Sequence, residues 1–208
     1  MKVINSINMK KTILILYFFA LVTISGAQDF DKNLATARTA YGAGKLEDAR
    51  FAMEQMLRDL DIAIGKEIMK MLPTRLGTLN YNTKDDNVTG GSGSIIGLFV
   101  HRAYGVDPKM GTIEIMNNSP MITALSAMLT TPIFGGMMRD ENQKQIKVQG
   151  YKSLLTKNVN SETGKTNYEL QVPMNNTLLT LKMDDTNEGE ITTLANSIPL
   201  AKIAQLAQ

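Results

Sequence analysis

QIKVQGYKSLLTKNVNSETGKTNYELQVPMNNTLLTLKM, residues 145–183, is the stretch that decides the class of fold. It holds short apolar and β-rich segments separated by polar residues, a pattern typical of strands joined by turns. We predict four strands, at 145–148, 151–156, 168–172 and 177–183. A short helix is expected to start near Glu188, because Asn187 and Glu190 have capping-box spacing, and Pro199 should separate it from a second one.

The preceding segment has a similar order of elements. Strands are expected at 76–81, 95–104 and 112–116, with a polar loop over 84–94. Ser119-Pro120 then places an N-cap residue before a proline at the first helical position, which predicts a helix that ends before Pro132. The strands-then-helix order occurs twice, so we predict an α+β fold, an antiparallel sheet with packed helices that could be an internal duplication.

Two helices are predicted ahead of this body. Phe30, Leu34, Ala37 and Tyr41 share one helical face, and Gly42-Ala43-Gly44 interrupts the pattern. A second apolar stripe then runs at helical spacing and ends at Pro73. Its members are Leu46, Ala49, Met53, Met56, Leu57, Leu60, Ile64, Ile68 and Met71.

This front end resembles a single tetratricopeptide-like helical hairpin. The resemblance is carried by Ala40-Tyr41, by GKLEDA at 44–49 with its small residue Ala49, and by Met53 and Met56-Leu57. The turn is one residue shorter than is usual in that family, and only one unit is present where about three stabilise one another. The resemblance implies a hairpin rather than an array, and a generic antiparallel hairpin explains the same residues.

The body resembles a pattern of small exported proteins of unknown function. Its marks are the Met-rich helix opened by Ser119-Pro120, the Gly135-Gly136 loop and the hairpins that follow. This resemblance implies export, and it carries no activity that could be transferred to this chain.

The N-terminus has the features of a secretory signal peptide. Met9-Lys10-Lys11 precedes an apolar run, and Ser25-Gly26-Ala27 offers a cleavage site. We therefore expect a signal peptide at 1–27, a helical hairpin at 28–73 and an α+β domain at 74–208, with Met1 or Met9 as the start. Cleavage would leave 19 basic and 20 acidic residues, a balance that gives no electrostatic reason to bind nucleic acid.

Residue types that support catalysis or metal binding are scarce. The chain has no Cys and a single His, His101, so thiol chemistry, zinc ribbons and two-histidine sites are excluded. The acidic run at 184–190 suggests calcium, although helix capping explains the same residues. We predict no catalytic residue, no metal site and no cofactor.

The segment 119–138 is the strongest candidate for an interaction surface. Its helix is apolar around more than half its circumference, and the connection that follows is apolar where loops are normally polar. It forms either a docking loop for a protein or lipid, or part of the core. The candidate interaction residues are Ile133, Phe134, Met137, Met138, Met121 and Met128.

These features favour a non-enzymatic protein that acts through protein–protein contacts in the periplasm or at the periplasmic face of the outer membrane. It would be an accessory or plug-like subunit of an envelope or secretion complex. The expected partner is another envelope protein, such as an outer-membrane channel or translocon, with no nucleic acid and no transmembrane span after cleavage. A carrier of a hydrophobic small molecule or lipid is the alternative, and a hydrolase with a carboxylate-only site is the third.

Overall fold

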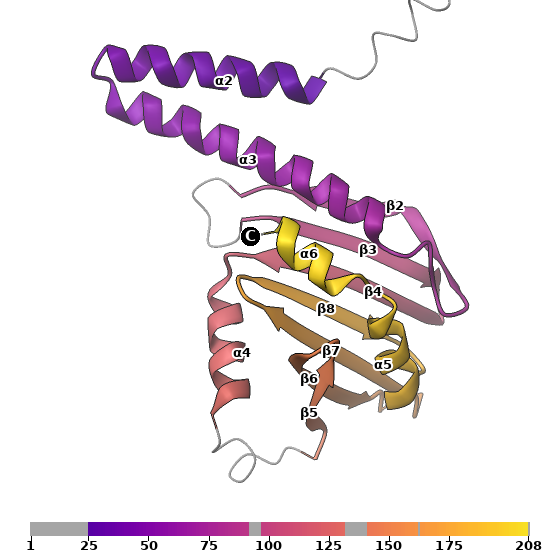
Figure 1. Cartoon of the computed structure of the whole chain (residues 1–208). Helices are drawn as coiled ribbons and strands as arrows, with labels where there is room; N and C mark the ends of the chain where they lie inside the picture. The colour runs from indigo at the N-terminus through magenta and orange to yellow at the C-terminus, as the bar shows by residue number, and fades with distance from the viewer. Residues whose placement is uncertain (1–24, 92–96, 132–140, 162, 208) are drawn as a thin grey trace, which may run out of the picture. The chain divides into compact units, whose positions relative to one another are not determined.

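A computed structural model describes residues 25–91, 97–131, 141–161 and 163–207, and it shows an α+β fold (Figure 1). Two compact units divide the chain after Asp59. Two helices begin the described chain, and an eight-stranded antiparallel sheet and further helices follow. The elements are α2 (Ser25–Gly42), α3 (Leu46–Met71), β1 (Arg75–Leu76), β2 (Leu79–Thr89), β3 (Phe99–Val106), β4 (Lys109–Asn117), α4 (Pro120–Thr130), β5 (Gln143–Val148), β6 (Tyr151–Val159), β7 (Thr166–Met174), β8 (Thr177–Met183), α5 (Glu188–Asn196) and α6 (Leu200–Leu206).

The strand order in the sheet is β1-β2-β3-β4-β8-β7-β6-β5. Each four-strand run pairs its neighbours along the chain, and the runs join where β4 pairs antiparallel with β8, for example at Ile113 with Leu181. Helix α4 follows the first run and α5 follows the second, so the strands-then-helix order occurs twice.

Both faces of the sheet carry helices. The main core lies on the face covered by α5, α6 and the C-terminal half of α3, and it includes Ile68 of α3 and Leu72 just past the end of that helix. Because successive residues of a strand point to opposite faces, Leu178 and Leu179 serve different cores. Leu179 belongs to the main core, whereas Leu178 and Leu154 pack with α4.

Local signals in the sequence set several element ends. Ser119 caps α4, since its side chain accepts a hydrogen bond from the Met121 amide, and Pro120 takes the first helical position. Asn187 caps α5 by accepting from the Glu190 amide. The Glu190 carboxylate accepts from the Thr186 hydroxyl at 2.8 Å.

The expectation of a polar loop over 84–94 is wrong for most of its length, because β2 runs to Thr89. The reason is a buried cation on β3. Arg102 donates to the Asp86 carboxylate from Nε at 2.9 Å and from Nη2 at 2.7 Å. Asp86 lies between Asn82 and Asn87, where the register between β2 and β3 shifts, so its carboxylate reaches the guanidinium from an irregular stretch of the strand.

Arg102 and its neighbour on the same face also hold the end of α3. Arg102 Nη1 donates to the Leu72 carbonyl, and the Tyr104 hydroxyl donates to the Pro73 carbonyl at 2.9 Å. The hydrogen bond to Asp86 raises the pKa of Arg102, and burial raises the pKa of Tyr104. Both groups therefore stay protonated and act as donors at neutral pH.

We expect Asp86→Asn to lower the free energy of unfolding by about 3 kcal/mol, because it leaves a buried guanidinium without its charge partner. Urea unfolding followed by circular dichroism measures this. Asp85→Asn is the matched control, since Asp85 is exposed, and it should change stability by less than about 0.5 kcal/mol. Equal effects of the two variants would show that Arg102 does not depend on Asp86.

Candidate functional site

The hairpin of α2 and the N-terminal part of α3 is joined by a tight, glycine-dependent turn. The Lys45 amide donates to the Ala40 carbonyl, and the Gly44 amide donates to the Tyr41 carbonyl. Gly44 has a φ of 72°, in the left-handed region that favours glycine. Together these are the two bonds of a Schellman motif, which ends α2 and lets α3 start at Leu46.

Small residues form the contact between these helices. Ala37 and Ala40 of α2 are buried, as are Ala49 and Ala52 of α3. Ala49 is buried, with an exposed fraction of 2%, and the expectation that it lies at a close approach of the two helices stays a prediction. Because alanine has no side chain beyond Cβ, the helices can approach closely without filling the space on either side.

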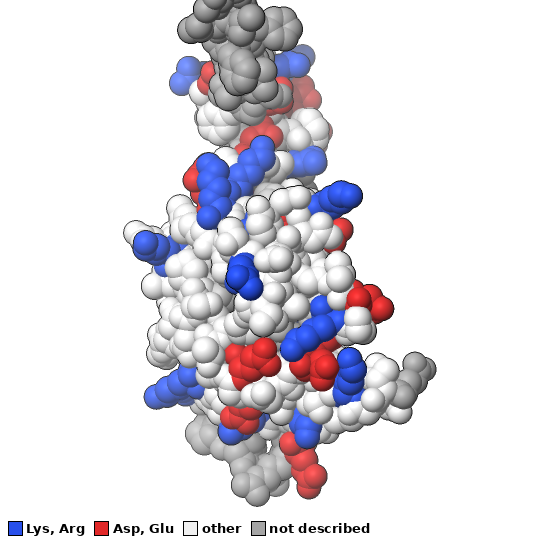
Figure 2. All heavy atoms as spheres, turned by 90° about the vertical axis from the view of Figure 1, so that its right-hand side faces the viewer, with Lys and Arg blue, Asp and Glu red and all other residues white. Residues whose placement is uncertain are grey.

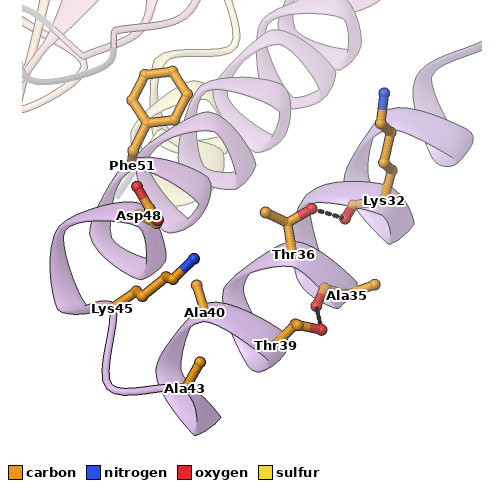
Figure 3. A pocket seen from close by; sticks show the side chains of 9 residues that line it. All are labelled: Lys32, Ala35, Thr36, Thr39, Ala40, Ala43, Lys45, Asp48 and Phe51. Atoms are coloured by element: carbon orange, nitrogen blue, oxygen red, sulfur yellow. Dashed lines mark hydrogen bonds between the residues drawn. The ribbon is translucent and has the colours of Figure 1, made fainter.

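A groove opens along one side of this contact, with a volume of about 610 Å³ (Figure 3). Both helices of the hairpin contribute to its wall. The lining residues are Lys32, Ala35, Thr36, Thr39 and Ala40 from α2, Ala43 directly after it, Lys45 from the turn, and Asp48 and Phe51 from α3.

Hydrogen bonding makes the wall more apolar than its composition suggests. Thr36 Oγ1 donates to the Lys32 carbonyl and Thr39 Oγ1 donates to the Ala35 carbonyl, each at 2.9 Å (Figure 3). Each hydroxyl proton is thus used within the helix. The groove therefore combines alanine and threonine methyl groups with the Phe51 ring, and the Lys45 side chain extends between the two helices (Figure 3).

The hairpin unit also exposes large apolar side chains outside the groove. Tyr41, Leu46, Met53 and Leu57 are between 48% and 67% exposed. Single exposed apolar residues are ordinary, but a cluster on one short unit is typical of a surface that binds something.

The six predicted interaction residues fall in different places. Ile133, Phe134, Met137 and Met138 lie outside the described residues. Met121 is half exposed on α4, and Met128 packs against the small core of that helix. The two described residues therefore have different environments, one open to solvent and one in contact with Leu125 and its neighbours.

His101 lies on the sheet face that carries α4 and pairs with charged neighbours. Its Nδ1 is 3.4 Å from Glu114 Oε1, and Lys182 Nζ is 3.4 Å from Glu114 Oε2. The His101 ring also stacks on Phe99, with 6.4 Å between ring centroids. Among the described residues, these contacts surround the imidazole with a carboxylate and an aromatic ring.

The acidic run at 184–190 is used by lysines and by the start of α5. Lys144 pairs with Glu188 at 2.6 Å, and Lys165 pairs with Asp185 at 3.2 Å. Among the residues that the structure describes, no group of three or more His, Cys, Asp or Glu side chains is arranged to hold a metal ion.

Comparisons with protein-family models, with curated proteins and with solved structures give no match.

We expect Ala49→Leu to destabilise the hairpin by about 1–3 kcal/mol, because three extra carbon atoms must fit where the helices touch. Thermal unfolding followed by the helical circular dichroism signal measures the loss. Arg38→Leu, at an exposed position of α2, is the control and should be nearly neutral. An unchanged midpoint for Ala49→Leu would mean that the helices do not pack at this residue.

The two methionines of α4 should respond differently to a polar substitution. Met128→Ser removes a side chain from the small core and should cost about 1–2 kcal/mol, whereas Met121→Ser should cost less than about 0.5 kcal/mol. Chemical denaturation compares the two variants directly. A large loss for Met121→Ser would place that residue in the core as well.

Proposed function

We propose that this chain is an exported, non-enzymatic binding protein that acts through protein contacts made by its helical hairpin. It would serve as an accessory or plug-like subunit of an envelope assembly, in the periplasm or at the periplasmic face of the outer membrane. The groove of Figure 3 is the observation that carries the proposal, because it is open, walled by methyl groups and built on two helices. The signal-peptide-like sequence at 1–27 supports the location.

The groove's chemistry narrows the kind of partner. An apolar segment would fill the methyl-lined wall and contact Phe51, and aromatic anchors of this type carry much of the energy in protein interfaces. Lys32 and Lys45 outnumber Asp48 among the charged lining residues, so the partner segment should carry carboxylates beside its apolar residues. We expect a short amphipathic, acidic segment of another envelope protein.

The face shown in Figure 2 gives less reason to propose a binding site. Figure 2 shows a face on which basic and acidic side chains are interspersed rather than gathered into a broad area of one sign. No helix among residues 25–91, 97–131, 141–161 and 163–207 is long and apolar enough to cross a membrane.

Filling the groove tests the proposal. Ala35→Trp places a large ring in the groove from an exposed position, so it should lower the affinity for the partner at least about tenfold while the fold stays intact. Co-purification from the envelope in mild detergent, with quantified stoichiometry, gives the readout. Lys45→Glu should weaken the same complex by reversing a charge at the groove.

Arg38→Trp is the matched control, because it puts the same side chain on the same helix outside the groove. A complex lost equally in both variants would contradict the groove as the binding site. A bound lipid in native mass spectrometry, displaced by Ala35→Trp with no protein partner, would favour the carrier of a hydrophobic small molecule instead, since the groove's volume suits such a ligand.

A further inference from the structure

A second apolar surface lies on α3, away from the groove. Leu46, Met53 and Leu57 are 64%, 48% and 60% exposed, and Arg50 lies between them. Positions 46, 50, 53 and 57 follow alternating steps of four and three residues, which is the spacing of a coiled-coil seam. At about 100° per residue, Phe51 of the groove lies about 160° around the helix from Met53. We call Leu46, Arg50, Met53 and Leu57 the α3 seam.

The charges around the α3 seam restrict what can cover it. Arg50 sits within the seam, and Glu47 and Glu54 follow Leu46 and Met53 by one residue. A purely apolar partner would leave Arg50 with carboxylates only from its own helix, Glu47 at i−3 and Glu54 at i+4, and would cover these charges as well, which is costly. An anionic lipid surface would attract Arg50 but repel both glutamates. The surface that fits must supply apolar residues and a carboxylate opposite Arg50.

A second copy of the chain meets both requirements when the two helices run antiparallel. We propose that this protein forms a dimer through the α3 seam, with Leu46 of each copy against Leu57 of the other and Arg50 against Met53. This register places Arg50 one residue from Glu54 of the second copy, so the same ion pair forms twice. A parallel arrangement would instead set Arg50 against its own counterpart, with like charges together.

The arrangement is isologous, because each residue pair in it is repeated by the two-fold axis. The α3 seam covers 12 residues, which is about 18 Å of helix, shorter than a coiled coil that is stable alone. We therefore expect weak, concentration-dependent dimers with a Kd of about 10–100 µM, at the low end of specific interfaces. This self-association does not depend on the groove or on the proposed function.

Sedimentation equilibrium of the native chain from about 5 to 500 µM tests the dimer over the expected Kd range. Wild type should fit a monomer–dimer equilibrium, and Leu57→Ser should weaken it at least about tenfold. Arg50→Glu should weaken it similarly, and Arg50→Glu combined with Glu54→Arg should restore it, because the swap rebuilds the pair between copies. Phe51→Ser, on the groove side, is the control and should leave the equilibrium unchanged. Circular dichroism confirms that each variant stays folded.

Several results would overturn the proposal. They include a wild-type monomer across the whole range, a charge swap that fails to restore association, and a dimer lost with Phe51→Ser but kept with Leu57→Ser. A monomer that binds phosphatidylglycerol vesicles through Leu57 would assign the α3 seam to a lipid surface. Because none of these variants is Ala35→Trp, a failed dimer and a failed groove are distinguishable.

Discussion

The anchoring of the C-terminal end of α3 by Arg102 is the interaction on which the body of the fold depends. The last carbonyls of a helix lack partners inside it, and here Leu72 and Pro73, just past the helix, receive donors from Arg102 and Tyr104. A cation at this end is also favoured by the helix dipole. The same guanidinium holds Asp86, and therefore β2, in place. One buried charge thus connects α3, β2 and β3.

α3 also packs closely against the sheet, and this close packing depends on Gly65, which has no side chain. A Cβ added at Gly65 would lie 2.4 Å from a Val88 methyl group and 2.8 Å from a Leu98 methyl group. Glycine in the middle of a helix lowers helix propensity, yet α3 is continuous through Gly65. The cost in helix propensity, about 1 kcal/mol, is offset because the helix lies closer to the strands and buries Ile68 and Leu72 more completely.

The sequence predicts those features that are determined by residues close together in the chain. Ser119-Pro120 and Asn187 act within one helical turn, so capping rules locate α4 and α5. The role of Asp86 depends on Arg102, which lies 16 residues away, and a polar segment gives no sign of a partner at that distance. One signal was available: alternation places Arg102 on the same face as Val100 and Tyr104, and a cation on a buried face requires an acid.

The groove was harder to predict, because it exists only once two helices are paired. Ala35, Thr36 and Thr39 look like ordinary polar or small surface residues, and their methyl-rich wall depends on where the threonine hydroxyls donate. The emphasis on 132–138 followed from local hydrophobicity alone. The helical stripe at Leu46, Met53 and Leu57 was visible in the sequence, but hydrophobic spacing does not show which face a neighbour covers.

The small contact between α2 and α3 links the stability of the hairpin to binding. Each alanine buries little more than a methyl group, so the contact contributes much less than leucines would. The N-terminal half of α3 extends a helix whose other half packs one face, including Ile68, on the main core, so it needs no separate nucleation, whereas α2 must nucleate by itself. Separation of α2 from α3 is therefore the local opening of the hairpin that needs the least free energy. Under the proposed function, a ligand in the groove would contact both helices, so it would bind only the closed hairpin and stabilise it by mass action.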